Sequence, residues 1–368
     1  MVSGVSGSTR TLRIGQRVVG DGQPCFVIAE GGVNHNGDPR LATELVHIAA
    51  RCQADAVKFQ KRTIHELLTR EALERPYLHP NSLGATYGEH REKLELAEEV
   101  WYRLRDLATR LGLEFMGSAW DRGSADLLEA LDTPAIKMPS AVLTDLDLLE
   151  YVARKGRPMI VSTGMSTLEE VDQAVERILA HTDQLILLQC TSAYPSEFVD
   201  INLRVMETYR QRYGVLVGYS GHERGISVTE AAATLGACVV ERHFTRDRTL
   251  PGPDHAASLE PTGLQKLVRD IRQIEMAMGK PEKCVAPAEV PVRARLGKSV
   301  VAARHIMAGT LISADMLTVK SPGDGIAANQ LERLVGRVAR IDVARDRSLP
   351  PEALAWELRG AAHSREAH

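Results

Sequence analysis

Eight short apolar segments alternate with amphipathic stretches along the chain, and this alternation is the feature that most constrains its fold. Near-continuous apolar strands separated by helices are typical of a parallel sheet that is covered on both faces. Eight such repeats predict a (β/α)8 barrel, and the chain length up to residue 278 fits that fold with one insertion. The expected strands are 25–30, 56–60, 114–119, 135–138, 158–163, 184–190, 215–220 and 238–244.

The stretches between these strands carry the 3.6-residue apolar period of helices, most clearly at 39–52, 167–180, 225–237 and 260–278. One connection differs, because residues 61–92 lack a steady period and contain several prolines and glycines. A loop of this length in a compact domain is usually functional, as a lid or a subunit contact. The alternative is a surface excursion with no function of its own.

After the last helical stretch, the alternation of apolar strands and helices ends. We expect the barrel domain to span 1–280 and the proline-interrupted segment 281–296 to be an extended linker. Residues 297–360 have short strands and glycine-rich turns, which predict a compact β-rich module. The polar tail 361–368 is expected to fray.

The composition excludes several classes of protein. Lys and Arg total 45 against 48 Asp and Glu, so a formal net charge of −3 gives no reason to expect nucleic acid or an anionic membrane as a partner. The five cysteines are scattered and form no C-x-x-C pair, which favours a reducing compartment. The polar N-terminus lacks a signal core and no apolar run is long enough to span a membrane, so we expect a cytoplasmic protein.

The expected strands also share a direction, because nearly all begin with apolar residues and end with polar ones. Surface charges scattered at random would not follow the chain direction in this way. Since the active site of a (β/α)8 barrel lies where the strands end, these polar residues predict a site at that rim. They are Glu30, Lys58, Gln60, Ser118, Lys137, Ser140, Ser162, Thr163, Thr191, Ser192, Tyr194, Ser220, His222, Glu241 and His243.

The segment "VVERHF" at 239–244 shows this change within a single strand. Glu241 and His243 are two residues apart and share one face, whereas Arg242 points toward the helices, where we expect it to form a structural ion pair. His222 ends the neighbouring strand. Two imidazoles at adjacent strand ends predict a catalytic site for Mn, Fe, Co or Zn with open coordination positions. The alternative is that one or both histidines are ordinary core residues.

Lys58 and Lys137 end strands that are otherwise hydrophobic. A buried ammonium group is costly unless an anion compensates it, and the hydroxyls at the same rim are donors that complete a phosphate or carboxylate site. A structural Lys–Glu pair is the competing interpretation. A lysine that attacks a carbonyl to form a Schiff base is a further possibility.

These residues occur in motifs that resemble the sialic acid (N-acetylneuraminate) synthase family. The motifs are "IAEGGVNHNGD" (28–38), "ADAVKFQ" (54–60), "STGMSTLEEV" (162–171), "QCTSAYP" (189–195), "GYSGHERGI" (218–226) and "ERHFTRDRTLPGPDHAASLEP" (241–261). "ALERPY" and "TYGEH" in the insertion resemble the animal-type enzymes, which act on a phosphorylated sugar. Residues 297–320 resemble the family's C-terminal antifreeze-like (SAF) domain, which implies a β-clip fold for this module.

The resemblance implies condensation of phosphoenolpyruvate with an aldose such as N-acetylmannosamine, with or without a 6-phosphate, to give a nonulosonic acid and phosphate. It also implies a divalent metal, Mn²⁺ or else Mg²⁺, and a domain-swapped homodimer. By position, His222 and His243 would bind the metal and act in catalysis with Glu30 and Glu241. Phosphoenolpyruvate would contact Lys58, Ser118, Lys137, Ser140, Ser162, Ser192 and Ser220, and the sugar would contact Gln60, Tyr194, Asp254 and Lys320.

Two departures from the family pattern concern the acceptor sugar. The family commonly has an acidic residue five positions after the second lysine, where "KMPSAV" has Val142. The bacterial enzymes have an arginine before Pro-Gly in the antifreeze-like domain, where "VKSPGDG" has Ser321 beside Lys320. A lost buried hydrogen bond changes specificity by orders of magnitude. A synthase of another ulosonic acid is therefore an alternative, and a non-catalytic sugar-phosphate binding protein is a more distant one.

Overall fold

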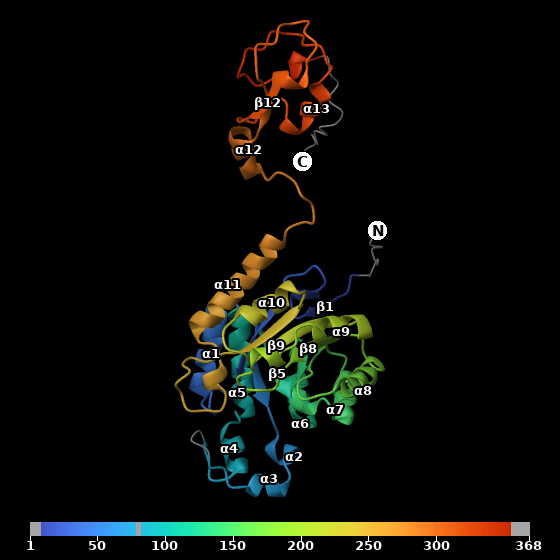
Figure 1. The fold of residues 1–368 in the computed structure, drawn as a ribbon. Coiled ribbons are helices and arrows are strands. Elements are labelled where there is room, and N and C mark those ends of the chain that lie inside the picture. The colour runs from blue at the N-terminus through green and yellow to red at the C-terminus, as the bar shows by residue number, and fades with distance from the viewer. Residues whose placement is uncertain (1–8, 79–81, 355–368) are drawn as a thin grey trace. The chain divides into compact units, whose positions relative to one another are not determined.

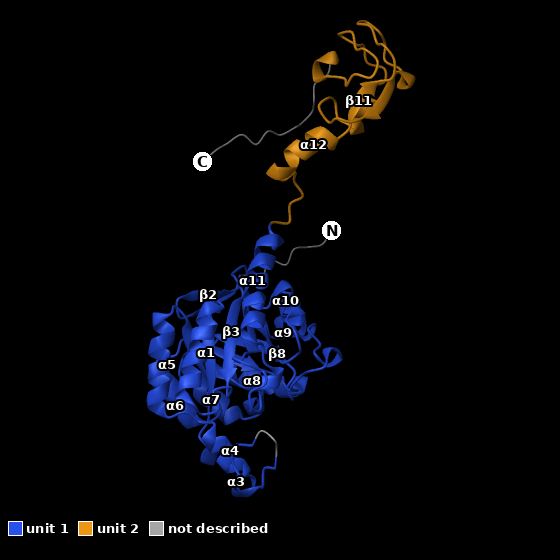
Figure 2. Ribbon diagram, turned by 90° about the vertical axis from the view of Figure 1, so that its left-hand side faces the viewer, with its two compact units in different colours: residues 1–279 blue, residues 280–368 orange. Residues whose placement is uncertain are grey.

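The computed structural model of the chain describes residues 9–78 and 82–354. They form two compact units, divided between Gly279 and Lys280, which are coloured blue and orange in Figure 2. The polar tail expected at 361–368, and the last residues of the expected module from 355 onward, lie outside the described residues.

The first unit contains a closed barrel of eight parallel strands, which confirms the predicted fold (Figure 1). Strands adjacent in sequence are adjacent in the barrel, and the last strand closes against the first with His243 opposite Glu30. The strands are β3 (Phe26–Gly32), β4 (Ala56–Lys61), β5 (Glu114–Ala119), β6 (Ile136–Met138), β7 (Met159–Ser162), β8 (Leu185–Cys190), β9 (Leu216–Gly221) and β10 (Val239–His243).

Helices cover the outside of the barrel, and their sequences show why they form. In α8, Thr167 and Glu170 form a capping box, and the buried residues follow helical spacing: Val171, Ala174, Val175 and Ile178. The side chain of Asp38 caps α1 by accepting a hydrogen bond from Arg40 N. The helices of this layer are α1 (Pro39–Arg51), α5 (Glu98–Arg110), α6 (Arg122–Ala130), α7 (Leu146–Ala153), α8 (Leu168–Leu179), α9 (Val205–Tyr213), α10 (Ser227–Thr234) and α11 (Pro261–Met278).

The barrel strands carry two hydrophobic layers, because successive side chains point to opposite faces. Val27 packs in the large layer between strands and helices, whereas its neighbour Ile28 packs inside the barrel. The inner layer is extended by Ile14 and Val19 from a hairpin that the sequence analysis did not predict, β1 (Thr11–Ile14) and β2 (Arg17–Gly20). In Figure 1 this hairpin lies at one end of the barrel, opposite the inserted helices α2 to α4.

The described part of the insertion after β4 contains three short helices, α2 (Ile64–Leu67), α3 (Arg70–Glu74) and α4 (Tyr87–Lys93). None is long enough to show a period in the sequence. The rings of Tyr77 and Tyr87 meet edge to face with centroids 5.4 Å apart, which packs the segment after α3 against α4.

The second unit has its own small core, a two-stranded antiparallel sheet, β11 (Ser299–Ala302) and β12 (Leu317–Lys320), and the short helix α13 (Leu331–Leu334). The expectation of an extended linker over 281–296 is wrong for its last part, which forms α12 (Val290–Leu296). Pro291 lies in the first turn, where a helix does not need its N–H. Gly323 N donates to Ala294 O at 2.8 Å, so this helix is attached to the module.

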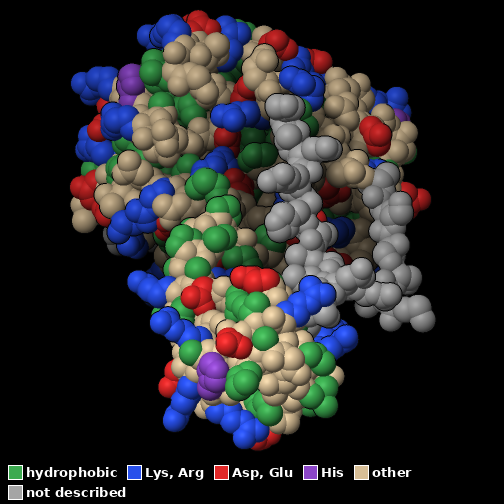
Figure 3. All heavy atoms as spheres, turned by 90° about the horizontal axis from the view of Figure 1, so that it is seen from above, with side chains coloured by type: hydrophobic (Ala, Val, Ile, Leu, Met, Phe, Trp, Pro, Cys, Tyr) green, Lys and Arg blue, Asp and Glu red, His purple; other side chains and the backbone are tan. Residues whose placement is uncertain are grey.

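Single 3-10 turns complete the secondary structure at Ser140–Val142, Phe198–Asp200, His255–Ala257, Pro287–Glu289, Ala314–Met316, Ala328–Gln330 and Pro351–Ala353. Over residues 9–78 and 82–354, no helix combines the length and the apolar character that crossing a bilayer requires. On the face seen in Figure 3, basic and acidic side chains are interspersed, in keeping with the small net charge.

Candidate active site

A cavity of about 200 Å³ lies at the carboxyl ends of the barrel strands, and most of the predicted site residues line it. These are Glu30, Lys58, Gln60, Ser118, Lys137, Ser140, Ser162, Ser192, Tyr194, Ser220, His222, Glu241 and His243. Four predicted residues remain, of which Thr163 and Thr191 line an adjoining cavity. Asp254 has its Oδ2 3.6 Å from Nδ1 of His243, at the edge of this group. Lys320 belongs to the second unit.

The barrel's own periodicity brings these groups together. Ile28, Ala56 and Val239 belong to the apolar layer inside the barrel. Two residues further along the same strands, on the same face, stand Glu30, Lys58 and Glu241. The same step leads from the inner layer to Ser118, Lys137, Ser162 and Cys190. The site is therefore the next layer of the barrel interior, in which polar side chains replace apolar ones.

Two lysines and two carboxylates form the charged centre of the cavity. Lys58 pairs with Glu30, lies 3.5 Å from Glu241 Oε1 and donates to Ser118 Oγ at 2.7 Å. Lys137 Nζ lies 3.9 Å from the same oxygen of Glu241. Each lysine thus has a carboxylate partner, as the structural interpretation required, but these pairs line a cavity instead of filling the core.

In this centre, burial and neighbouring charges have opposite effects on the pKa values of the ionisable groups. Burial opposes ionisation of Glu241, but the nearby Lys137 and Lys58 outweigh it and hold the pKa of that carboxyl below its usual range. For Lys137, burial is the larger effect, and it lowers the pKa of the ammonium despite the attraction of Glu241. A bound anion would stabilise the charged form of Lys137.

Serine hydroxyls surround the lysines on the side of β7 and β8. Ser140 Oγ accepts from Gly164 N at 2.9 Å, whereas the buried Oγ of Ser162 has no hydrogen-bond partner among the described residues. A Cβ on Gly164 would stand 2.3 Å from Ser192 Oγ, so only glycine leaves room for these hydroxyls to converge. Such neutral donors suit the oxygens of a phosphate or carboxylate.

His222 and His243 lie side by side, with ring centroids 5.4 Å apart. His222 Nδ1 lies 2.8 Å from the carbonyl oxygen of Thr191, which requires a proton on Nδ1 and leaves the Nε2 lone pair for a ligand. The buried Nδ1 of His243 has no hydrogen-bond partner in the described part of the chain. The two side chains fit an open, catalytic type of metal site.

The surroundings shift the pKa values of the two imidazoles in opposite directions. Burial opposes charge on His222, but the adjacent Cys190 sulfur and the Thr191 carbonyl outweigh it and raise the pKa of this imidazole. Burial lowers the pKa of His243, which favours the neutral, ligating form. Among the described residues no group of three or more His, Cys, Asp or Glu side chains is arranged to hold a metal. Any ion here would complete its coordination with water or substrate.

Arg242 points away from the cavity, as predicted from strand alternation. Its Nη1 donates to Glu223 Oε1 at 2.7 Å and to Thr229 Oγ1 at 2.8 Å, and both charged side chains are buried in the outer layer. This confirms its structural role.

The positions that depart from the family pattern are also defined. Ala141 lines the cavity, whereas Val142 is buried in the hydrophobic layer outside the barrel. In the second unit, Lys320 forms an ion pair with Asp346, and Ser321 Oγ donates to Leu296 O at 3.2 Å.

Several lining residues were not predicted, namely Trp120, Pro139, Ala141, Met165 and Cys190. Cys190 could have been found, because it stands two residues after Leu188 of the inner layer. The others come from loops, whose direction strand alternation does not predict.

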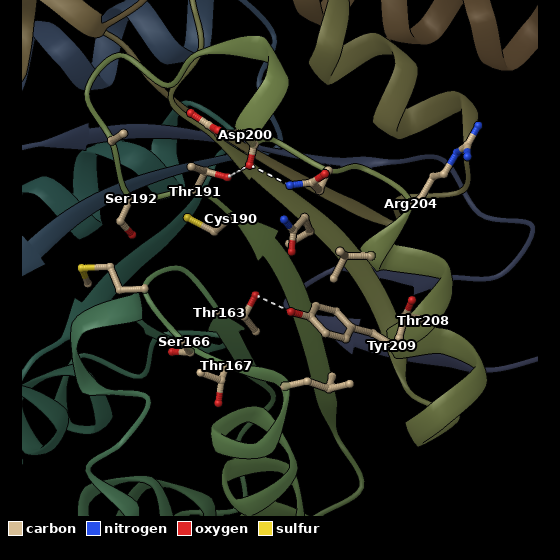
Figure 4. Close-up of a pocket in the computed structure, with 16 residues that line it drawn as sticks. Thr163, Ser166, Thr167, Cys190, Thr191, Ser192, Asp200, Arg204, Thr208 and Tyr209 are labelled. Atoms are coloured by element: carbon tan, nitrogen blue, oxygen red, sulfur yellow. Dashed lines mark hydrogen bonds between the residues drawn. The ribbon is translucent and has the colours of Figure 1, made fainter.

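A larger cavity of about 920 Å³ adjoins the first and shares Met165, Cys190 and Ser192 with it (Figure 4). The loops after β7 and β8 line it. Some of its polar groups are bonded to one another: Tyr209 OH donates to Thr163 Oγ1 at 3.0 Å, and Thr191 Oγ1 donates to Asp200 O at 3.1 Å. This cavity has no ionisable cluster comparable to the first one among its lining residues.

Comparison with known proteins agrees with this arrangement. The model of the NeuB family matches residues 45–283, and that of the SAF domain matches residues 297–355. N-acetylneuraminate-9-phosphate synthase of Homo sapiens is 41% identical over 91% of this chain and 94% of its own length. N,N'-diacetyllegionaminic acid synthase of Legionella pneumophila is 41% identical over 90% of this chain and 94% of its own length.

Among solved structures, the N-acetylneuraminic acid synthetase of Leptospira borgpetersenii superposes with a TM-score of 0.68 at 28% identity, covering 77% of this chain and 95% of its own. Both parts of the chain, the barrel with its charged rim and the small β-rich module, thus have counterparts in one group of proteins. The chain belongs to the NeuB family and carries a SAF domain at its C-terminal end.

Proposed function

We propose that this chain condenses phosphoenolpyruvate with an aldose, releasing phosphate and forming a nonulosonic acid. The single observation that carries this proposal is the convergence of two buried lysines, a layer of serine hydroxyls and an imidazole pair on one cavity. Relatives named as synthases of N-acetylneuraminate 9-phosphate and of N,N'-diacetyllegionaminic acid support it.

In the phosphoenolpyruvate half of the site, Lys58 and Lys137 would neutralise the phosphate and carboxylate. Ser118, Ser140, Ser162, Ser192 and Ser220 would donate hydrogen bonds to their oxygens. The Oγ of Ser162, which finds no hydrogen-bond partner within the described residues, and the lowered pKa of Lys137 both support an anion at this position. The substrate would be fixed with its C3 toward the imidazole side of the cavity, ready for attack on a carbonyl.

In the acceptor half, Gln60, Tyr194 and Asp254 would hold the open-chain sugar. Attack of C3 on the aldehyde carbon forms the new C–C bond, leaves a cation at C2 and turns the aldehyde oxygen into an alkoxide, which takes up a proton to become the product hydroxyl. A water molecule adds there after losing a proton to Glu241 or Glu30, and the resulting hemiketal phosphate collapses to the ketone and free phosphate. Both carboxylates line the cavity, which supports either as the proton acceptor.

We also propose that His222 and His243 bind a divalent metal, Mn²⁺ in preference to Mg²⁺. When bound, it would supply Lewis-acid polarisation of the acceptor aldehyde. The Nδ1–H of His222 would fix that ring for coordination through its contact with Thr191 O.

The acceptor is the part of the function for which two candidates remain. An N-acetylmannosamine-like aldose, with or without a 6-phosphate, corresponds to the human relative. A different aldose, giving another ulosonic acid, corresponds to the equally similar relative from Legionella pneumophila. Ala141 at the cavity wall supports a pocket without an acidic contact at that turn.

We further propose that two copies of the chain form a domain-swapped homodimer in the cytoplasm, in which Lys320 of one copy contacts sugar bound to the other. The reducing cytoplasm suits cysteines that are all free: Cys25, Cys52, Cys190, Cys238 and Cys284. A fully active monomer would contradict the swapped arrangement.

Phosphate release tests the function itself. Purified protein would be supplied with phosphoenolpyruvate, Mn²⁺ and, in separate reactions, N-acetylmannosamine, its 6-phosphate and a 2,4-diacetamido-trideoxyhexose. Aldose-dependent phosphate release is the expected result, and the aldose with the highest kcat/KM identifies the acceptor. Trapping of pyruvate by borohydride would instead indicate a Schiff-base aldolase.

A further inference from the structure

A buried arginine, Arg62, lies immediately after β4 at the edge of the acceptor half of the cavity. Its side chain is 4% exposed, so its charge needs fixed partners to offset the lost hydration. Nη2 donates to Oε1 of Gln60, and Nη1 lies 3.5 Å from Oε1 of Glu95. The guanidinium also stands over the ring of Trp120, with Cζ 4.5 Å from the centroid. Three neighbours thus fix its position.

Gln60 connects this arginine to the charged centre. Its Nε2 donates to Glu30 Oε1 at 2.9 Å, and Glu30 pairs through its other oxygen with Lys58. A glutamine amide has one acceptor end and one donor end. Because Arg62 occupies the acceptor end, the donor end must face Glu30. A flipped amide would place its NH2 against the guanidinium and its oxygen against the carboxylate, which is unfavourable at both ends.

We propose that Arg62 is a positioning residue for the acceptor half of the active site. It fixes the amide of Gln60 and, through that amide, the orientation of Glu30, although Arg62 itself is not among the residues that line the cavity. The proposal rests on the proposed function, in which Gln60 holds the acceptor and Glu30 is one of two candidate proton acceptors. Trp120 lines the cavity as well, so the same guanidinium supports a second part of that wall.

The contacts explain why an arginine suits this position. Its planar fork reaches Gln60 with one nitrogen and Glu95 with the other, while its face covers an indole ring. A lysine ammonium at the same place would keep the charge beside Glu95 but would lack the fork and the flat face. Arg62→Lys therefore separates the effect of charge from the effect of orientation.

The test combines steady-state kinetics with a double-mutant cycle. Arg62→Met, Arg62→Lys, Gln60→Ala and the double variant Arg62→Met with Gln60→Ala would be assayed by phosphate release, varying each substrate in turn. We expect both Arg62 variants to lower kcat/KM for the aldose by about 10- to 100-fold. The KM for phosphoenolpyruvate should stay at the wild-type value. The double variant should be no worse than Gln60→Ala alone, because Arg62 acts through that amide.

Arg91→Met is the matched control, since Arg91 is also an arginine of this region but contacts Tyr87 instead of Gln60. It should keep wild-type kinetics. Arg62→Lys keeps the proposal testable if Arg62→Met does not fold, because the cation beside Glu95 is retained.

Three results would overturn the proposal: wild-type kinetics in Arg62→Lys, an additive loss in the double variant, or an equal loss in Arg91→Met. Wild-type protein that releases no phosphate with any aldose would instead contradict the proposed function, and with it the positioning role of Arg62. The two failures are distinguishable, because only the second is seen in the unmutated protein.

Discussion

Replacing Lys137 by methionine removes one of the two buried cations proposed to hold phosphoenolpyruvate while keeping most of the side-chain volume. The structure gives a scale for the loss. Unit charges separated by 3.9 Å, the distance from Lys137 Nζ to Glu241 Oε1, attract by about 4 kcal/mol at an effective dielectric constant of about 20. A substrate anion at a similar distance would lose a comparable free energy, reduced by the remaining attraction of Lys58. We therefore expect kcat/KM for phosphoenolpyruvate to fall by about 10²- to 10³-fold.

The assay is phosphate release at saturating aldose, with phosphoenolpyruvate varied. Lys137→Arg is the control, because it keeps a cation at this position. Thermal unfolding should be little affected in Lys137→Met, since Lys58 still lies 3.5 Å from Glu241 and compensates it. A folded Lys137→Met protein that loses less than about tenfold in kcat/KM, or about 1.4 kcal/mol, would refute the assignment of Lys137 to the anion.

Three further predictions concern the metal, the outer layer and pH. Chelation, His222→Ala and His243→Ala should each abolish turnover; full activity of metal-free His222→Ala would contradict the imidazole site. Arg242→Met should lower the free energy of unfolding by about 3 to 5 kcal/mol in urea titrations, because Glu223 stays buried without its partner; a change near zero would disprove this. Because burial lowers the pKa of Lys137 and its ammonium is the binding form, kcat/KM for phosphoenolpyruvate should fall as pH rises through that pKa. The fall should move to higher pH in Lys137→Arg.

The eight barrel strands were predictable because a strand buried on both faces must be apolar almost throughout. The expected segment 114–119 coincides with β5, and the others differ from the observed strands by one or two residues at an end. The direction of Arg242 was predictable for a related reason, since alternation within one strand needs no knowledge of its neighbours.

The elements that were missed are short or depend on tertiary contacts. Each strand of the β1–β2 hairpin has four residues, too few for a clear period, and its apolar residues pack only once the barrel exists. The prolines near α12 suggested extended chain, yet one of them occupies the first turn of the helix.

The rim of the site was predictable, but the residues behind it were not. Lys58 and Glu241 stand at strand ends, where a charged residue after an apolar run is recognisable in the sequence. Arg62 is not recognisable in this way, because its role comes from its contact with Gln60 together with contacts to Glu95 and Trp120, which lie far away in the sequence. The side chains of a 3-10 turn point in directions about 120° apart, so Val142 and Ala141 face different layers.

The central claim is that one cavity holds phosphoenolpyruvate and an aldose and joins them. Its most direct test is a mass spectrum of the product together with released phosphate, from wild-type protein given both substrates and Mn²⁺. The account predicts one phosphate per molecule of a new acid, whose mass equals that of the aldose plus phosphoenolpyruvate plus water minus phosphoric acid. Release of phosphate at the same rate without any aldose, or no new acid from any aldose tried, would contradict it.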